Sequence, residues 1–188
     1  MKNFKSIALA LVAFVSFATT AQTRKKVDAS KSTINWVGKK VTGAHEGTIS
    51  LKEGALIFKG KKLVGGNFTV DMTTINTTDL SGKGKTNLDG HLKSDDFFGV
   101  EKFPTATLVI KSIGDKGNGV YSATADLTIK GKTESIKFDL TVAENTASTT
   151  LKVDRTKYDI KYGSGSFFSD LGDKTIHDDF DLTVKLAF

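Results

Sequence analysis

Three histidines are the side chains best suited to acid–base or metal chemistry, since the chain contains no cysteine. His177 is followed directly by Asp178 and Asp179, and a histidine beside carboxylates can bind a metal or act as a general base. His45 and His91 lie far from it in the sequence, and there is no G-x-S-x-G nucleophile motif. The pattern therefore favours a surface histidine beside solvated acids over an enzyme or a metal site.

Two further short motifs could indicate chemistry. Gly84-Lys85-Thr86 resembles the end of a phosphate-binding loop, but that motif requires a glycine five positions before Gly84, where this chain has Asp79. Asn67 and Asn76 each begin an Asn-x-Thr glycosylation pattern, which is short enough to recur by chance. We therefore expect no nucleotide site, no cofactor and no catalysis.

Most of the chain after Ile34 alternates apolar and polar residues with a period of two, which is typical of strands with one buried face. Glycines or asparagines separate eight or nine such runs. No helical segment is long enough for a parallel crossover, so the sheet is expected to be antiparallel. Sustained one-sided strands predict an all-β protein, an extended eight-stranded antiparallel β-barrel. Within it, residues 48–52 and 55–59 are expected to form a hairpin around Glu53-Gly54.

One segment, Leu88–Ile110, departs from the strand pattern. Leu88 and Leu92 are four residues apart, which is the same-face spacing of a helix. Asn87 and Ser94 can each cap a short helical turn, because their side-chain oxygens accept from free backbone N–H groups. The segment therefore predicts one short helical insert in the barrel.

The rest of this segment fixes where we expect the insert to end. Asp95-Asp96 would fall in a first helical turn, where negative charge is favoured. Gly99 would end that turn, and Pro104 would return the chain to extended geometry. The insert, tipped by Phe97-Phe98, is expected to cap the open end of the barrel.

Two long irregular segments each carry a pair of adjacent phenylalanines. Phe97-Phe98 lies within Ile75–Phe103, and Phe167-Phe168 lies within Tyr162–Asp179. Loops of this length inside a compact domain are usually functional or disordered. The two pairs could be plugs of the domain's own core, or they could form the lip of a pocket.

The side chains that the alternation turns inward are almost all apolar. An eight-stranded barrel is just wide enough to fill itself with side chains or to hold one slim ligand. Strands of nine or ten residues rise about 30 Å, which fits a long hydrocarbon chain better than a compact ring system. The predicted inward row is Trp36, Phe68, Val70, Met72, Leu108, Ile110, Tyr121, Leu127, Phe138, Leu140, Leu151, Phe180, Leu182 and Val184.

The inward row supports two functions of different classes. The first is an exported protein that carries or stores a long apolar lipid and does no covalent chemistry. The alternative is a self-filled barrel that acts through its surface as an envelope stress or partner-binding protein. That alternative predicts no cavity.

The beginning of the chain has the features of a secretory signal peptide. Lys2 and Lys5 precede an apolar run, Ile7–Phe17, that is too short to cross a bilayer, and small residues follow at 19–21. Cleavage after Ala21 would leave residues 22–188 as one domain and lower the net charge from +6 to +4, because both lysines leave without an acid. We expect a periplasmic or secreted protein.

The basic balance of the chain comes largely from three clusters, at residues 24–26, 59–62 and 83–85. Such clusters could face an anionic membrane or an anionic head group, or they could be solvated turn residues. Export makes nucleic acid a poor fit as a partner. The sequence leaves a homodimer open.

Several stretches of the chain also resemble one known family. Residues 89–110, DGHLKSDDFFGVEKFPTATLVI, resemble the hallmark of the YceI-like family of bacterial periplasmic polyisoprenoid-binding proteins. Ala125–Thr133 and Ser32–Trp36 are similar to two further motifs of that family. The residues that match the hallmark are His91, Leu92, Lys93, Ser94, Asp96, Phe97, Phe103, Pro104, Ala106 and Thr107.

The resemblance implies a lipocalin-like barrel that holds an isoprenoid chain, such as a quinone tail or a polyprenyl phosphate. It places His91 near any polar head group. The chain departs from the family pattern at Lys40, where many members have histidine, and at Glu134-Ser135, where a Lys-Pro pair is usual. The predicted ligand-binding residues are nine of the inward row and six others. The nine are Trp36, Phe68, Val70, Met72, Leu108, Ile110, Tyr121, Phe138 and Phe180, and the six are His91, Leu92, Phe97, Phe98, Phe167 and Phe168.

Overall fold

The computed structural model describes residues 21–188. The predicted signal peptide, apart from Ala21, lies outside these residues. The helical elements are α1 (Gly82–Lys93) and two 3-10 turns, η1 (Arg155–Tyr158) and η2 (Gly172–Lys174). The strands are β1 (Gln22–Lys26), β2 (Asp28–Lys40), β3 (Gly43–Lys59), β4 (Lys62–Thr77), β5 (Thr105–Gly117), β6 (Val120–Ile129), β7 (Lys132–Val142), β8 (Thr146–Asp154) and β9 (Ile176–Ala187).

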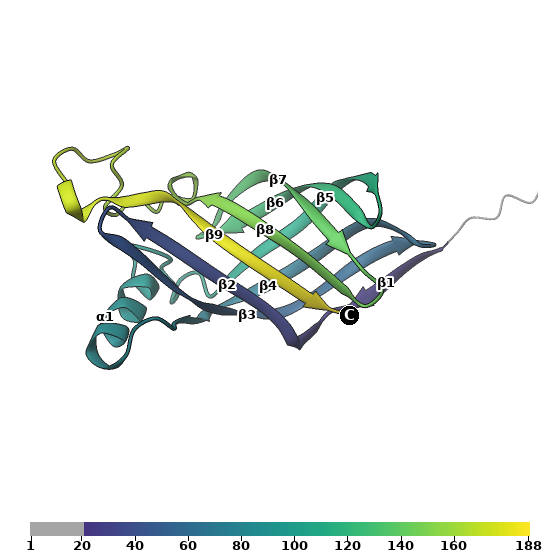
Figure 1. Ribbon diagram of the computed structural model, residues 1–188, viewed down its shortest axis with the longest axis horizontal. Coiled ribbons are helices and arrows are strands. Elements are labelled where there is room, and N and C mark those ends of the chain that lie inside the picture. Colours follow the sequence, from purple (N-terminus) through teal and green to yellow (C-terminus); the bar gives the residue numbers. More distant parts are fainter. Residues whose placement is uncertain (1–20) are drawn as a thin grey trace, which may run out of the picture.

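The strands are antiparallel and close into a barrel. Their order is β1-β3-β2-β9-β8-β7-β6-β5-β4, and the pairing of β3 with β4 closes the ring. β1 and β2 follow one another along the same edge of β3, because Lys26 pairs with Ala55 and Ile34 pairs with Ile49. Together they occupy one place in the ring, which confirms the predicted eight-stranded barrel (Figure 1).

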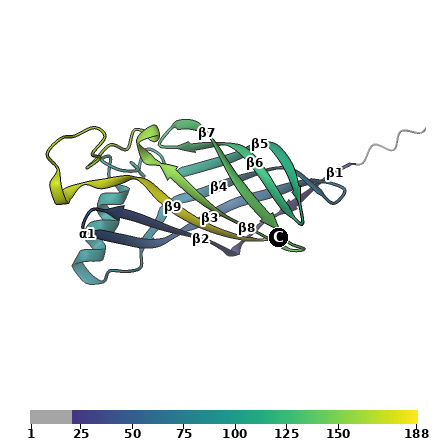
Figure 2. The ribbon, with the colours of Figure 1, turned by 45° about the horizontal axis from the view of Figure 1, so that its top comes forward.

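The barrel is elongated and its two ends differ (Figures 1 and 2). We call the end that carries α1, the turn 94–103 and the loop 159–175 the mouth. We call the opposite end, with β1, the turns at 60–61 and 143–145 and the C-terminal Phe188, the closed end. Within the described residues, no helix has both the length and the apolar character needed to span a bilayer.

Side chains fill the closed end of the barrel. The rings of Phe58 and Phe188 lie 6.0 Å apart, and the ammonium of Lys25 lies 5.4 and 4.9 Å from their centroids. Leu56 and Tyr121 are buried in the same cluster. This end is therefore packed with apolar groups and covered by one cation.

The strand alternation matches the observed burial. Along β6 the buried and partly buried residues alternate without a break, and Tyr121, Ala123, Ala125, Leu127 and Ile129 are the buried set. A strand with one face in the core and one in solvent shows this pattern. The predicted faces of this strand are confirmed.

The predicted hairpin around Glu53-Gly54 is wrong. Residues 43–59 form the single strand β3, and a register shift between Leu51 and Glu53 marks a bulge in it. A Cβ on Gly54 would lie 2.5 Å from Cδ1 of Phe68. The glycine therefore serves close packing within a continuous strand, not a turn.

The predicted helical insert exists but lies earlier in the sequence than expected. α1 begins after Ser81, and Ser94 ends the helix, where its N–H contacts the carbonyls of Gly90 and His91. Asp95 lies beyond the helix and pairs with Lys102 at 2.6 Å. The shared face of Leu88 and Leu92 is confirmed, because both pack on the core at the mouth.

Gly47 provides a test of packing at the mouth. A Cβ there would overlap the carbonyl oxygen of Asn76 and lie 2.5 Å from Cζ2 of Trp36. We expect Gly47→Ala to lower the free energy of unfolding by about 2–3 kcal/mol, since backbone and indole must both move. Urea denaturation followed by circular dichroism measures this.

Gly84→Ala is the matched control for that substitution. Its Cβ would meet nothing within 4 Å, and it lies inside α1. Alanine should raise stability there by about 0.5–1 kcal/mol. An unchanged midpoint for Gly47→Ala would contradict the packing described.

Candidate functional site

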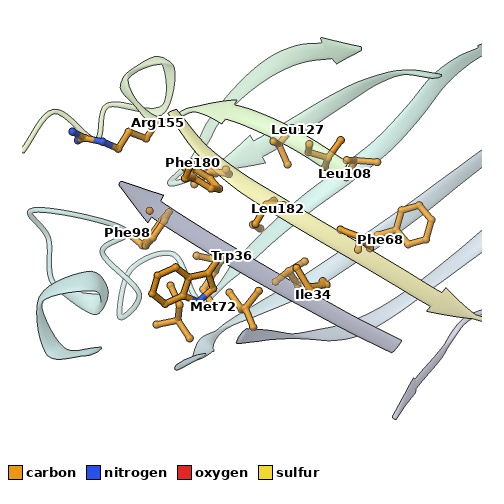
Figure 3. A pocket seen from close by; sticks show the side chains of 18 of the residues that line it. Ile34, Trp36, Phe68, Met72, Phe98, Leu108, Leu127, Arg155, Phe180 and Leu182 are labelled. Atoms are coloured by element: carbon orange, nitrogen blue, oxygen red, sulfur yellow. The ribbon is translucent and has the colours of Figure 1, made fainter. Parts of the chain in front are cut away.

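Between the two ends, the inward side chains leave a cavity of about 190 Å³. In the same measure one water molecule needs roughly 10–15 Å³, so the cavity is about an order of magnitude larger than a single-water void. Its walls are almost entirely hydrocarbon. Figure 3 shows the cavity, with Phe98, Phe180 and Arg155 toward the mouth and Phe68 toward the closed end.

The structure brings eleven of the fifteen predicted ligand-binding residues to the walls of this cavity. They come from five strands, from α1 and from the turn that follows α1. The eleven are Trp36, Phe68, Val70, Met72, Leu92, Phe97, Phe98, Leu108, Ile110, Phe138 and Phe180.

Tyr121 and His91, two further predicted ligand-binding residues, do not line the cavity. Tyr121 does point inward, but it belongs to the packed cluster at the closed end. His91 lies on α1 with its ring centroid 5.0 Å from that of Phe97 and 4.5 Å from that of Tyr162. It therefore packs among aromatic rings beside the mouth.

Phe167 and Phe168 were predicted to be either plugs of the core or the lip of a pocket, and both predictions are wrong. The two residues are 51% and 50% exposed, so they do not plug the core. They are also absent from the cavity walls, so they form no lip. The ammonium of Lys161 lies 5.0 Å from the ring of Phe167 on the outside of the loop. Alternation predicts inward faces on strands, but it gives no direction for a residue in a loop.

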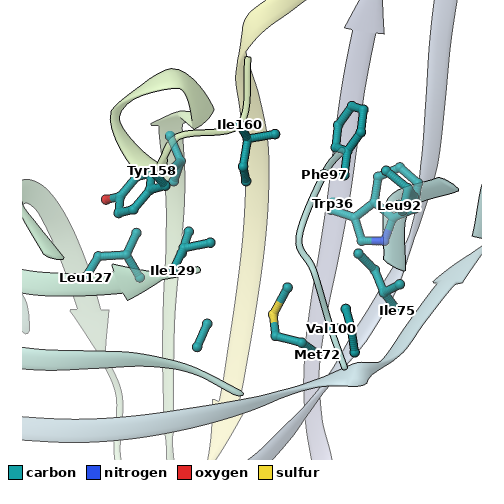
Figure 4. Packing of buried hydrophobic residues seen from close by; sticks show 12 residues of the cluster. Trp36, Met72, Ile75, Leu92, Phe97, Val100, Leu127, Ile129, Tyr158 and Ile160 are labelled. Carbon is teal, nitrogen blue, oxygen red and sulfur yellow. The ribbon is translucent and has the colours of Figure 1, made fainter. Parts of the chain in front are cut away.

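α1 and the turn after it cover the mouth. Leu92 and Phe97 are buried against the cavity, and Phe98 packs edge-on against Phe180 of β9, with ring centroids 6.4 Å apart. The predicted capping of one barrel end by this insert is confirmed. Figure 4 shows Leu92 and Phe97 beside Trp36 in the cluster at this end.

A polar clamp fastens α1 to the end of β4. The ammonium of Lys85 donates to Asn76 Oδ1 at 2.6 Å, to the carbonyl of Thr77 at 2.7 Å and to Asp89 at 2.7 Å. Asp89 also accepts the Thr77 N–H at 2.8 Å. Burial opposes ionisation of Asp89, but these hydrogen bonds outweigh it and hold the pKa of its carboxyl below the ordinary value. The carboxyl of Asp89 is therefore ionised at neutral pH.

The wall of the barrel splits between β7 and β8 on the side of the mouth. These strands pair only at Thr141 with Ser148 and at Val142 with Ala147. The turn η1 packs against β7, and Tyr158, which is 1% exposed, joins the buried cluster beside Leu127 (Figure 4). Burial raises the pKa of Tyr158 to about 12, so its hydroxyl stays neutral. η1 is thus a plug beside the split.

Arg155 holds this plug in place. Its side chain is 3% exposed, and it donates from Nε to the carbonyl of His177 at 3.0 Å and from Nη1 to that of Ile160 at 2.8 Å. Nη2 donates to the carbonyl of Ile176 at 3.1 Å. One buried guanidinium therefore links η1 to β9 and to the segment that follows η1.

Among residues 21–188, the charged residues of the cavity wall lie only at the mouth, where Lys39, Arg155 and Asp179 reach it. Lys39 pairs with Asp181 at 2.6 Å, and Arg155 lies 3.8 Å from Asp178. The cations of this rim are thus already matched by carboxylates.

The cluster His177-Asp178-Asp179 lies at this rim. Burial opposes ionisation of Asp178, but hydrogen bonds from Ser164 and Ser166 and the Arg155 charge keep the pKa of its carboxyl below the ordinary value. Among residues 21–188 no three potential metal-ligating side chains come together. In the structure Asp178 lies at the rim and faces Arg155, and His177 is exposed beside it.

Sequence reasoning missed several residues of the cavity. Ile49 and Leu51 were hidden by the mistaken hairpin, because their alternation continues through β3. Ile34 also lines the cavity, and its place at the start of the first alternating run would have predicted this. No local sequence pattern indicated Arg155, because its burial depends on carbonyls more than twenty positions away as well as on that of Ile160.

Comparison with known protein families identifies one domain over most of the chain. A model of the YceI-like domain matches residues 26–188. A UPF0312 protein of Shewanella denitrificans is 37% identical over 84 residues, which are 45% of this chain and 42% of that protein. A UPF0312 protein of Staphylococcus aureus is 44% identical over 52 residues, 28% of each. The chain thus spans less than half the length of the curated relatives it matches.

Solved structures share the fold. BcnA of Burkholderia cenocepacia has a TM-score of 0.65 and 24% identity, over 86% of this chain and 99% of that one. A polyisoprenoid binding domain from Saccharophagus degradans has a TM-score of 0.59 and 15% identity, over 86% and 95%. The YCEI protein of Campylobacter jejuni has a TM-score of 0.55 and 16% identity, over 100% and 98%.

The role of Arg155 can be tested by substitution. We expect Arg155→Met to lower the free energy of unfolding by about 3 kcal/mol, because three carbonyls lose their donor at once. The matched control is Lys157→Met in the same turn, which is exposed and should change stability by less than about 0.5 kcal/mol. Equal urea midpoints for the two variants would refute the anchoring role.

Proposed function

Because the chain belongs to the YceI-like family, we propose that it binds a long apolar lipid inside its barrel. One observation carries the proposal: the cavity has hydrocarbon walls along its length and charged residues only at the mouth. Such a site offers no partners for the hydroxyls of a sugar or the base of a nucleotide. It suits a hydrocarbon chain.

We propose that the ligand is an isoprenoid chain, such as the tail of a quinone or of a polyprenyl phosphate. The polyisoprenoid binding domain from Saccharophagus degradans, which has a similar fold, supports this ligand class. Each buried methylene contributes about 0.8 kcal/mol, so eight to ten carbons would bind with roughly micromolar affinity before ordering costs.

The charge of the rim favours an uncharged head group on that chain. Lys39 and Arg155 each face a carboxylate, and Asp179 adds a further negative charge beside them. A phosphate would have to compete with these carboxylates for the same cations, and like charges repel. A quinone ring needs only hydrogen-bond donors at this place.

In this proposal the protein is a carrier or a store and does no covalent chemistry. We also propose that it works in the periplasm or outside the cell, which the signal-peptide features of residues 1–21 support. The alternative of a self-filled barrel requires that no cavity exists. The cavity between the two ends contradicts that requirement.

Organic extraction of the purified protein followed by mass spectrometry tests the proposal. We expect an isoprenoid lipid with an uncharged head, at close to one molecule per chain. Repeated extracts that contain neither isoprenoid nor acyl lipid would defeat the proposal, and an isoprenoid phosphate would defeat the part on the head group.

Two variants of adjacent residues on β5 sharpen this experiment. Leu108→Trp fills the cavity and should reduce bound lipid at least tenfold, whereas Val109→Trp points outward from a site that is already 42% exposed. A melting curve of each variant shows whether it is folded. Equal lipid in the folded variants would place the ligand elsewhere.

A further inference from the structure

The fold brings together two basic clusters that lie far apart in the sequence. β1 carries Arg24 and Lys26 and pairs with the end of β3, so that Arg24 faces Ile57 and Gln22 faces Lys59. At the turn that follows, Lys59 pairs with Lys62. Residues 24–26 and 59–62 therefore form one surface at the closed end of the barrel.

The basic side chains of this surface point outward. Residues directly opposite one another in an antiparallel pair share a face of the sheet. Lys25 faces Leu56 and turns inward with it, so Arg24 and Lys26 turn outward. We call Arg24, Lys26, Lys59, Lys61 and Lys62 the basic face; all five are exposed.

Carboxylates leave most of the basic face uncompensated. In the part of the chain that the structure describes, Lys62 alone of the five forms an ion pair, with Asp115 at 3.9 Å. Val64, exposed on β4 close to the turn, adds apolar surface beside these cations. Cations around a small apolar patch suit the surface of a membrane that contains anionic lipids.

One segment at the mouth has the opposite charge, whereas residues 82–103 carry four lysines and four carboxylates. Residues 159–179 contain five aspartates and only two lysines, so this segment is acidic although Phe167 and Phe168 are exposed on it. An anionic bilayer repels such a segment and attracts the closed end. The basic face and this acidic segment therefore lie at opposite ends of the barrel, which favours one orientation on a charged surface.

We propose that the basic face docks the protein onto anionic phospholipid bilayers, with the mouth turned away from the surface. The docking goes beyond the proposed lipid carriage, and it does not depend on a ligand in the cavity. Each basic residue near an anionic surface strengthens binding roughly fivefold. Four of them should together strengthen binding a few hundredfold at low salt. Screening at high salt should remove a gain in affinity of about that size.

Co-sedimentation with vesicles tests the proposal. The probes are vesicles of phosphatidylcholine with and without about one third phosphatidylglycerol, at low and at high salt. The test variant is Arg24→Gln/Lys26→Gln/Lys59→Gln/Lys61→Gln. The control, Lys83→Gln/Lys132→Gln/Lys137→Gln/Lys157→Gln, removes the same charge from exposed lysines outside the basic face.

We expect the parent protein and the control to bind only vesicles that contain phosphatidylglycerol, and to lose this binding at high salt. The test variant should bind at least tenfold more weakly while its melting temperature and extractable lipid stay unchanged. Equal losses in both variants would show an effect of net charge alone and overturn the proposal. Equal binding to pure phosphatidylcholine, or preference for soluble heparin over vesicles, would overturn it as well.

Discussion

Closure of β3 onto β4 forces every second side chain of the strands into one shared interior. Because those side chains are almost all apolar, the interior excludes charged groups along most of its length. The closed end is filled by packed rings and by Tyr121, whereas the middle is not filled. The cavity thus follows from the size of an eight-stranded barrel and from where its largest side chains lie.

Polar groups are confined to places where they hold covering elements rather than contact a ligand. Lys85 and Asp89 fasten α1 over the mouth, and Arg155 fastens η1 beside the split between β7 and β8. Each of the two cations donates three hydrogen bonds to acceptors of the protein itself. These polar groups hold α1 and η1 in place, and the cavity walls are apolar. Hydrophobic contact is therefore the main source of affinity for a ligand, which fits a lipid chain better than a small polar ligand.

The sequence predicted what depends on local pattern. Alternation on β6 identified the inward face correctly, and the spacing of Leu88 and Leu92 identified a helix. The hairpin at Gly54 failed, because a glycine needed to accommodate Phe68 looks the same in sequence as a glycine in a turn. The burial of Arg155 and the joining of two basic clusters into one face could not be predicted, since both depend on contacts between distant segments.

A crystal structure of the delipidated protein under xenon pressure tests the central claim most directly, because xenon enters dry apolar cavities. The account predicts xenon between Phe68, Leu108 and Leu182, with no ordered water among them. An interior filled by rearranged side chains, or one occupied by hydrogen-bonded water, would contradict it.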